Sequence, residues 1–144
     1  MQKPDFGEAL DLILAQDSRF HRDAYYFLRD ALDYTVNQRK KAREGVGHVT
    51  GQQLLKGIRQ YALKEFGPMV PTVLEHWGVT GCEHFGEMVF ALISVDVFGK
   101  SESDSIADFR EGYSFHEAFV APYLPEGALV HPRLRANQPA EELS

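Results

Sequence analysis

Helix start and stop signals divide much of this 144-residue chain into short segments with helical periodicity. The best delimited segment opens at Thr50-Gly51-Gln52-Gln53, a capping-box pattern, and closes at Gly67-Pro68. Between these signals, apolar residues recur every three or four positions, as along one face of a helix: Leu54, Leu55, Ile58, Tyr61, Ala62 and Phe66. The sequence therefore predicts a mainly α fold of short, well-delimited helices.

Similar patterns predict the other helices. Stretches 5–19, 20–43 and 71–77 are expected to be helical, with Asp5 as an N-cap, Pro71 in a first turn and Gly78 just past a helix end. Thr80 and Glu83 fit a further capping box, which would open a helix reaching about residue 98. That helix is apolar nearly all round, which predicts a buried central helix. Ser114 to Glu117 resembles one more capping box, so we expect five to six helices in all.

The turn at 78–80 lies between a short helix and a longer one, and these are the proportions of a helix-turn-helix. Residues 96–109, rich in turn formers, are compatible with a short C-terminal β-hairpin, which would complete a winged-helix-like arrangement. An orthogonal helical bundle with the same turn is the alternative.

We expect a single helical domain over 1–121, followed by a Pro-containing extended or disordered tail over 122–144. No apolar run approaches the roughly 18 residues of a membrane helix, so no membrane association is expected. The N-terminus lacks a basic segment followed by an apolar one, and a lone cysteine cannot form an intramolecular disulfide. These features predict a cytoplasmic protein.

The stretch 74–90 contains residue types that suggest reactivity, namely His76, Cys82 and His84. Their spacing matches no standard zinc pattern, so we expect no metal and no cofactor. A thiol at a helix start has a lowered pKa. However, residues two apart on a helix point about 200° apart, so only His76 could reach Cys82. We therefore expect no catalytic residue here and interpret Cys82 and His84 as incidental.

Charge is unevenly distributed in this chain, whose formal net charge is −6. Residues 68–99 contain no Lys or Arg, so a recognition helix in that span would be repelled by a DNA duplex. If nucleic acid binds, the basic segment 39–64 would bind it; a solvated helix face is the alternative interpretation. The cations concerned are Arg39, Lys40, Lys41, Arg43, Lys56 and Arg59.

Three motifs resemble those of a family of small bacterial proteins, known as planctomycete and verrucomicrobial conserved hypothetical proteins. They are HVTGQQLLKGIRQYALKEFGPMVPTVLEHWGV, FGEMVFALI and SESDSIADFREGYSFHEAF, and the likeness covers roughly residues 8–120. The resemblance implies a homologous fold without an assigned activity, and it does not include Cys82 or His84. It draws attention to three polar or aromatic positions, His48, His76 and Trp77.

These observations predict a non-enzymatic protein-interaction or regulatory module whose partner is another protein or a second copy of the chain. RNA or DNA binding through segment 39–64 is the alternative. A small hydrolase-type enzyme using His48 and His76 is a third hypothesis, and it requires those two side chains to converge in one pocket.

Overall fold

The computed structural model describes residues 5–42, 49–95, 97–98, 107–110 and 112–124. Within these ranges the chain is mainly helical and contains no strand, which confirms the mainly α part of the predicted fold class. The α-helices are α1 (Phe6–Gln16), α2 (Arg22–Lys41), α3 (Gly51–Phe66), α4 (Val70–Trp77), α5 (Cys82–Ser94) and the short α6 (Ala107–Arg110). Single turns complete them: η1 (Gly67–Met69), the π-helical η2 (His116–Val120) and η3 (Ala121–Tyr123).

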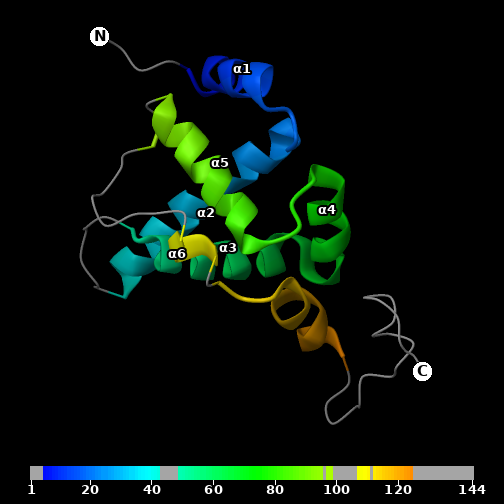
Figure 1. Ribbon diagram of the computed structural model, residues 1–144. Coiled ribbons are helices and arrows are strands. Elements are labelled where there is room, and N and C mark those ends of the chain that lie inside the picture. The colour runs from blue at the N-terminus through cyan, green and yellow to red at the C-terminus, as the bar shows by residue number, and fades with distance from the viewer. Residues whose placement is uncertain (1–4, 43–48, 96, 99–106, 111, 125–144) are drawn as a thin grey trace.

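The centre of the fold is the long contact between α2 and α3, with α5 packed across it (Figure 1). Helix α1 lies at one end of the molecule against α2 and α5, and α4 packs against α2 and α3. Helix α6 packs against α5 and α3. Helix α2 therefore contacts α1, α3, α4 and α5, and it connects the two ends of the fold.

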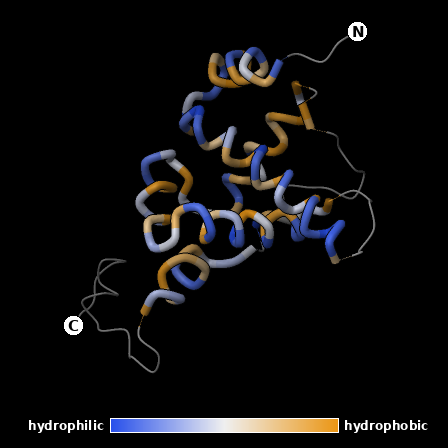
Figure 2. Tube along the Cα trace, turned by 180° about the vertical axis from the view of Figure 1, so that it is seen from behind, coloured by the Kyte–Doolittle hydropathy of each residue, from blue (hydrophilic) through white to orange (hydrophobic). Residues whose placement is uncertain are grey.

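The core is built from the apolar faces that the periodicity predicts. On α2 the buried apolar residues are Ala24, Phe27, Leu28 and Ala31, spaced three or four apart, and on α5 they are Phe85, Met88, Val89 and Leu92. Hydrophobic residues follow one another along the C-terminal half of α5 and alternate with hydrophilic ones on α2 (Figure 2). Gly86 lets α6 approach α5 closely, because a Cβ at that position would lie 2.8 Å from the Phe109 Cβ.

The helix ends predicted at Thr50, Gly67 and Gly78 are confirmed, whereas α1 ends at Gln16 and α5 at Ser94, earlier than predicted. Thr50 Oγ1 accepts the Gln53 N–H at 3.1 Å, and the Gln53 side chain accepts the Thr50 N–H at 2.9 Å. Gly67 and Gly78 end α3 and α4 with φ of 54° and 83°, values that favour glycine. Pro71 lies in the first turn of α4, where its missing N–H costs no hydrogen bond.

The capping box predicted at Thr80 and Glu83 is wrong. The N-cap of α5 is Gly81, which has no side chain to accept the free backbone amides of the first helical turn. Instead, Nδ1 of His84 accepts the Thr80 N–H at 3.0 Å. The helix therefore begins one residue later than predicted, and His84 has a structural role rather than the incidental one that we expected.

The hairpin predicted over 96–109 falls mostly outside the described residues. At its far end, Ala107–Arg110 are helical. Helices α4 and α5 flank the turn at 78–81 as expected, while the helix-turn-helix and winged-helix assignments stay predictions. Of the predicted tail, only residues 122–124 are described. None of the described helices is long and apolar enough to cross a membrane.

Candidate functional site

A groove of about 540 Å³ lies between α1, the start of α2 and the C-terminal half of α5. Its size is in the range of ~300–1,000 Å³ that is typical of ligand sites. The groove combines apolar walls with a charged rim, and its lining residues are Leu12, Ile13, Gln16, Asp17, Arg19, Phe20, Tyr25, Glu87, Phe90, Ala91, Ser94 and Val95.

The apolar walls come from α1 and α5. Leu12 of α1 is 58% exposed and lines one side of the groove. Phe90, Ala91 and Val95 are half-buried and line the opposite side. The expectation that α5 is buried all round is therefore only partly right: one face is in the core, and these three residues face the groove. The surplus of apolar residues on α5 was the sequence signal for this site.

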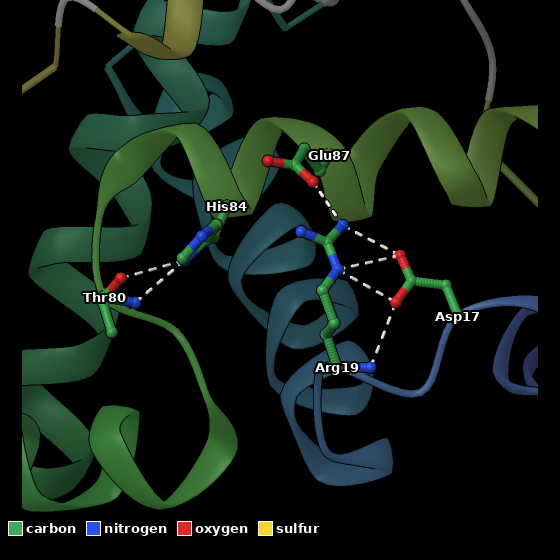
Figure 3. A network of polar contacts seen from close by, with 5 residues as sticks. All are labelled: Asp17, Arg19, Thr80, His84 and Glu87. Carbon is green, nitrogen blue, oxygen red and sulfur yellow. Dashed lines mark hydrogen bonds and ion pairs between the residues drawn. The ribbon is translucent and has the colours of Figure 1, made fainter.

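A charge cluster lies at the rim (Figure 3). The Arg19 guanidinium binds both carboxylate oxygens of Asp17, with Nε at 3.0 and 3.2 Å and Nη2 at 2.9 Å, and Nη2 also donates to Glu87 of α5. The Arg19 hydrogen bonds lower the pKa of Asp17, and the two carboxylates raise the pKa of Arg19. With two carboxylates and one guanidinium, the cluster carries a net charge of −1.

Tyr25 is the buried polar group of the groove. Its side chain is 1% exposed, and its phenol oxygen has no hydrogen-bond partner among the described residues. Burial raises the pKa of Tyr25 to about 12, with a further contribution from the negative charge of Asp17. The charges of Arg19 and Glu87 also act on this pKa, so the phenol oxygen faces the charge cluster.

The groove offers a ligand a hydrogen-bond donor and apolar walls. At neutral pH Tyr25 keeps its proton and can donate a hydrogen bond, and too little phenolate is present for it to act as a general base. Buried hydroxyls in folded proteins are almost always hydrogen-bonded, because an unpaired one costs ~1–3 kcal/mol. A ligand with an acceptor atom and an apolar group would satisfy the phenol and fill the walls.

Of the two neighbouring residues His76 and Trp77, only Trp77 lies in the core. Trp77 is buried, with its ring centroid 5.5 Å from that of Phe27 and 5.8 Å from that of Phe66. Its carbonyl accepts the His21 N–H at 3.0 Å. His76 is exposed, and its ring lies 5.4 Å from that of His21. His48 lies outside the described residues, so the convergence with His76 that the hydrolase hypothesis requires is untested.

The predicted basic residues that the structure describes lie in the last turn of α2 and on α3, away from the α1–α5 groove. Lys40 and Lys41 are exposed in the last turn of α2, while Arg39 and Lys56 line a second groove between α2 and α3. Arg59 is half-buried on α3. Arg43 lies outside the described part of the chain.

Cys82 is buried, so its position at the start of a helix does not make it a reactive thiol. Its Sγ donates to the Tyr113 carbonyl at 3.3 Å, and burial raises its pKa to about 11. The lowering expected from the helix N-terminus is outweighed because the thiolate would lose its hydration. Among the described residues, no three His, Cys, Asp or Glu side chains are grouped to hold a metal ion.

No protein-family model, curated protein or solved structure matches this chain. The bacterial family inferred from the sequence motifs stays a prediction. The groove residues Asp17, Arg19, Tyr25 and Glu87 were not predicted as site residues, since they come from three segments that only the fold brings together.

Proposed function

We propose that this protein is a non-enzymatic interaction module that binds a partner polypeptide in the groove between α1 and α5. The observation that carries the proposal is the buried phenol of Tyr25, which lacks a hydrogen-bond partner in the described structure and lines a groove with exposed apolar walls. A free polypeptide supplies both missing components, a backbone carbonyl for the phenol and an apolar side chain for the walls.

The charge at the groove rim indicates which residue types the partner segment should contain. The cluster of Asp17, Arg19 and Glu87 leaves one negative charge at the rim, so a lysine or arginine beside the inserted apolar residue is complementary to it. The expected partner segment therefore has an aliphatic or aromatic anchor next to a basic residue. Interface anchors of this kind provide most of the binding free energy.

A displayed library of random peptides tests this proposal. The library is selected on the wild-type protein, and the enriched peptides are then tested on Ala91→Trp, which fills the groove from α5. Thr72→Trp is the matched control, because Thr72 is exposed on α4 and does not line the groove. We expect enriched peptides with an apolar residue beside a basic one, which lose at least tenfold in affinity on Ala91→Trp and little on Thr72→Trp. Enrichment of no peptide that is sensitive to Ala91→Trp would overturn the proposal.

We further propose a winged-helix-like core, in a cytoplasmic bacterial protein of the family that the motifs resemble. The left-handed Gly78 between α4 and α5 supports the helix-turn-helix part. The turn-forming composition of 96–106 supports the wing, and the lone cysteine supports a reducing compartment. Backbone chemical shifts of residues 96–106 test the wing, since two extended stretches with cross-strand contacts are expected there and helical or random-coil shifts would refute it.

A further inference from the structure

The second groove, of about 360 Å³, lies where the C-terminal half of α2 meets α3. Its floor is made of small residues, and its sides carry cations and amides. The close approach of the two helices at Gly57 and Thr35 produces this shape. The lining residues are Thr35, Gln38, Arg39, Ala42, Gln53, Lys56, Gly57 and Gln60.

The charge of this surface has one sign. The stretches 35–42 and 49–60 contain five Lys or Arg and no Asp or Glu. No lining residue of the groove carries a carboxylate, whereas the rim of the α1–α5 groove carries two. The net negative charge of the whole chain is thus absent from this region.

We infer that the groove between α2 and α3 binds the backbone phosphates of a nucleic acid. Arg39 and Lys56 come from different helices and supply the charges that phosphodiesters require. The amides of Gln38, Gln53 and Gln60 are donors and acceptors suited to phosphate and sugar oxygens. Lys40 and Lys41, exposed in the last turn of α2, extend the positive surface beyond one phosphate.

This site is distinct from the proposed polypeptide groove. Tyr25 and Arg39 are fourteen residues apart on α2, a distance of about 21 Å along the helix axis. The contacts are to phosphates and not to base edges, so binding is expected to be insensitive to sequence. It also requires no cation on α5, which has none.

The binding of fluorescently labelled single-stranded RNA, followed by anisotropy in low salt, tests the inference. Lys56→Gln removes one cation of the groove, and Lys64→Gln is the matched control, because Lys64 is on the same helix but lies over the Tyr34 ring and outside the groove. Lys56 is exposed, so the variant is expected to fold, and circular dichroism checks this. Gln60→Glu is a second variant, which places a carboxylate in the groove.

We expect wild-type binding that weakens with salt, with a slope of about −0.7 per phosphate contacted. Lys56→Gln should weaken binding about three- to tenfold and reduce the slope by roughly one contact. Gln60→Glu should weaken it at least as much, and Lys64→Gln by less than twofold. Equal losses for Lys56→Gln and Lys64→Gln, or no binding in low salt, would overturn the inference.

Two competitors distinguish other sources of negative charge. Unlabelled RNA should displace the probe at concentrations at which inorganic phosphate and polyglutamate do not. Displacement by inorganic phosphate at the same concentration of phosphate groups would indicate a small-anion site, and displacement by polyglutamate an acidic-polypeptide site. Either result would overturn the assignment to nucleic acid.

Discussion

Gly57 of α3 lies directly against Thr35 of α2, and this contact sets the separation of the two longest helices. A Cβ on Gly57 would overlap the Thr35 hydroxyl oxygen. That oxygen is held in place, since it donates to the Ala31 carbonyl at 2.8 Å and Thr35 is buried. The floor of the α2–α3 groove depends on the same contact.

Gly57→Ala is therefore expected to destabilise the protein, although alanine is the better helix former. Overpacking of this kind costs ~1–3 kcal/mol, and the gain in helix propensity offsets at most ~1 kcal/mol of it. Unfolding by urea, followed by circular dichroism, measures the net loss. The Thr35→Ala/Gly57→Ala double variant should lose less than the sum of the two single variants. A single variant as stable as the wild type would show that the helices separate without cost.

Gly78 and Gly81 provide a matched pair in the turn before α5. At Gly78, φ is 83° and a Cβ would lie 2.6 Å from the Arg19 carbonyl oxygen, whereas at Gly81 the nearest atom is the Glu83 carboxylate at 3.8 Å. Gly78→Ser should destabilise the protein by more than ~1 kcal/mol. Gly81→Ser should be neutral or stabilising by up to about 0.5 kcal/mol, because Gly81 is the N-cap of α5 and serine is a slightly better cap than glycine. Melting temperatures that change in the reverse order would contradict both expectations.

The sequence predicts those parts of the fold that local signals determine. Thr50, Gly67 and Gly78 mark helix ends through interactions within a few residues, and all three were predicted. The N-cap of α5 was not, because His84 can bond the Thr80 amide only once the turn has its observed path. Close approaches such as Gly57 on Thr35 and Gly86 on Phe109 are tertiary, so periodicity does not reveal them.

The candidate site was less predictable for the same reason. Arg19 and Glu87 are 68 residues apart in sequence and are brought together only by the packing of α5 against α1 and α2. The usable signal was the surplus of apolar residues on α5, which we interpreted as complete burial. A helix of this composition is equally compatible with one face in the core and another in a groove, as Phe90 and Ala91 show.

Tyr25, which is buried, and Tyr113, which is partly buried, should respond differently to loss of the hydroxyl at neutral pH. Tyr113 Oη donates to the Leu55 carbonyl at 2.8 Å, while Tyr25 has no such partner among the described residues. Tyr113→Phe should cost ~0.5–1.5 kcal/mol, because it removes the hydrogen bond to the Leu55 carbonyl. Tyr25→Phe should cost less than ~0.5 kcal/mol or stabilise the protein. Urea unfolding compares the two variants, and a larger loss for Tyr25→Phe would show that its hydroxyl is already satisfied.

The raised pKa of Tyr25 also predicts a loss of stability at alkaline pH. The ordinary value is 10.0 and the folded value about 12, so the folded protein holds this proton more tightly than the unfolded chain. The associated stability is complete below pH 10 and is lost as the pH rises to about 12, by up to about 3 kcal/mol. Tyr25→Phe should reduce that loss. Urea unfolding across this pH range measures the loss. If wild type and variant lost stability in parallel, ionisation of Tyr25 would not be its cause.

Cys82 should be unreactive in the folded protein. Its pKa is raised by burial to about 11, so little thiolate is present at neutral pH and the sulfur is shielded from reagents. Labelling with a chromogenic disulfide reagent should be at least a hundredfold slower in buffer than in urea. Fast labelling in buffer would show that the Cys82–Tyr113 contact opens readily.

The charge cluster at the groove rim should contribute little to stability and more to binding. Arg19 is half-exposed, so its ion pairs are screened, and Arg19→Gln should cost only ~0.2–1 kcal/mol in low salt and less in high salt. Arg19 lowers the pKa of Asp17 below 3.8, so this stability is present above about pH 4 and is lost as the pH falls through the lower folded value. The variant should lose this acid dependence, as urea unfolding across the acid range would show.

The same substitution leaves both rim carboxylates and removes the cation, so the net charge of the cluster changes from −1 to −2. A basic peptide selected on the wild-type groove should therefore bind Arg19→Gln as tightly or more tightly, mainly through a faster association rate in low salt. Glu87→Gln is the opposing variant, with a net charge of 0, and should slow association. If Arg19→Gln weakened binding and Glu87→Gln strengthened it, the partner would be acidic at this position, and the proposed charge complementarity would be wrong.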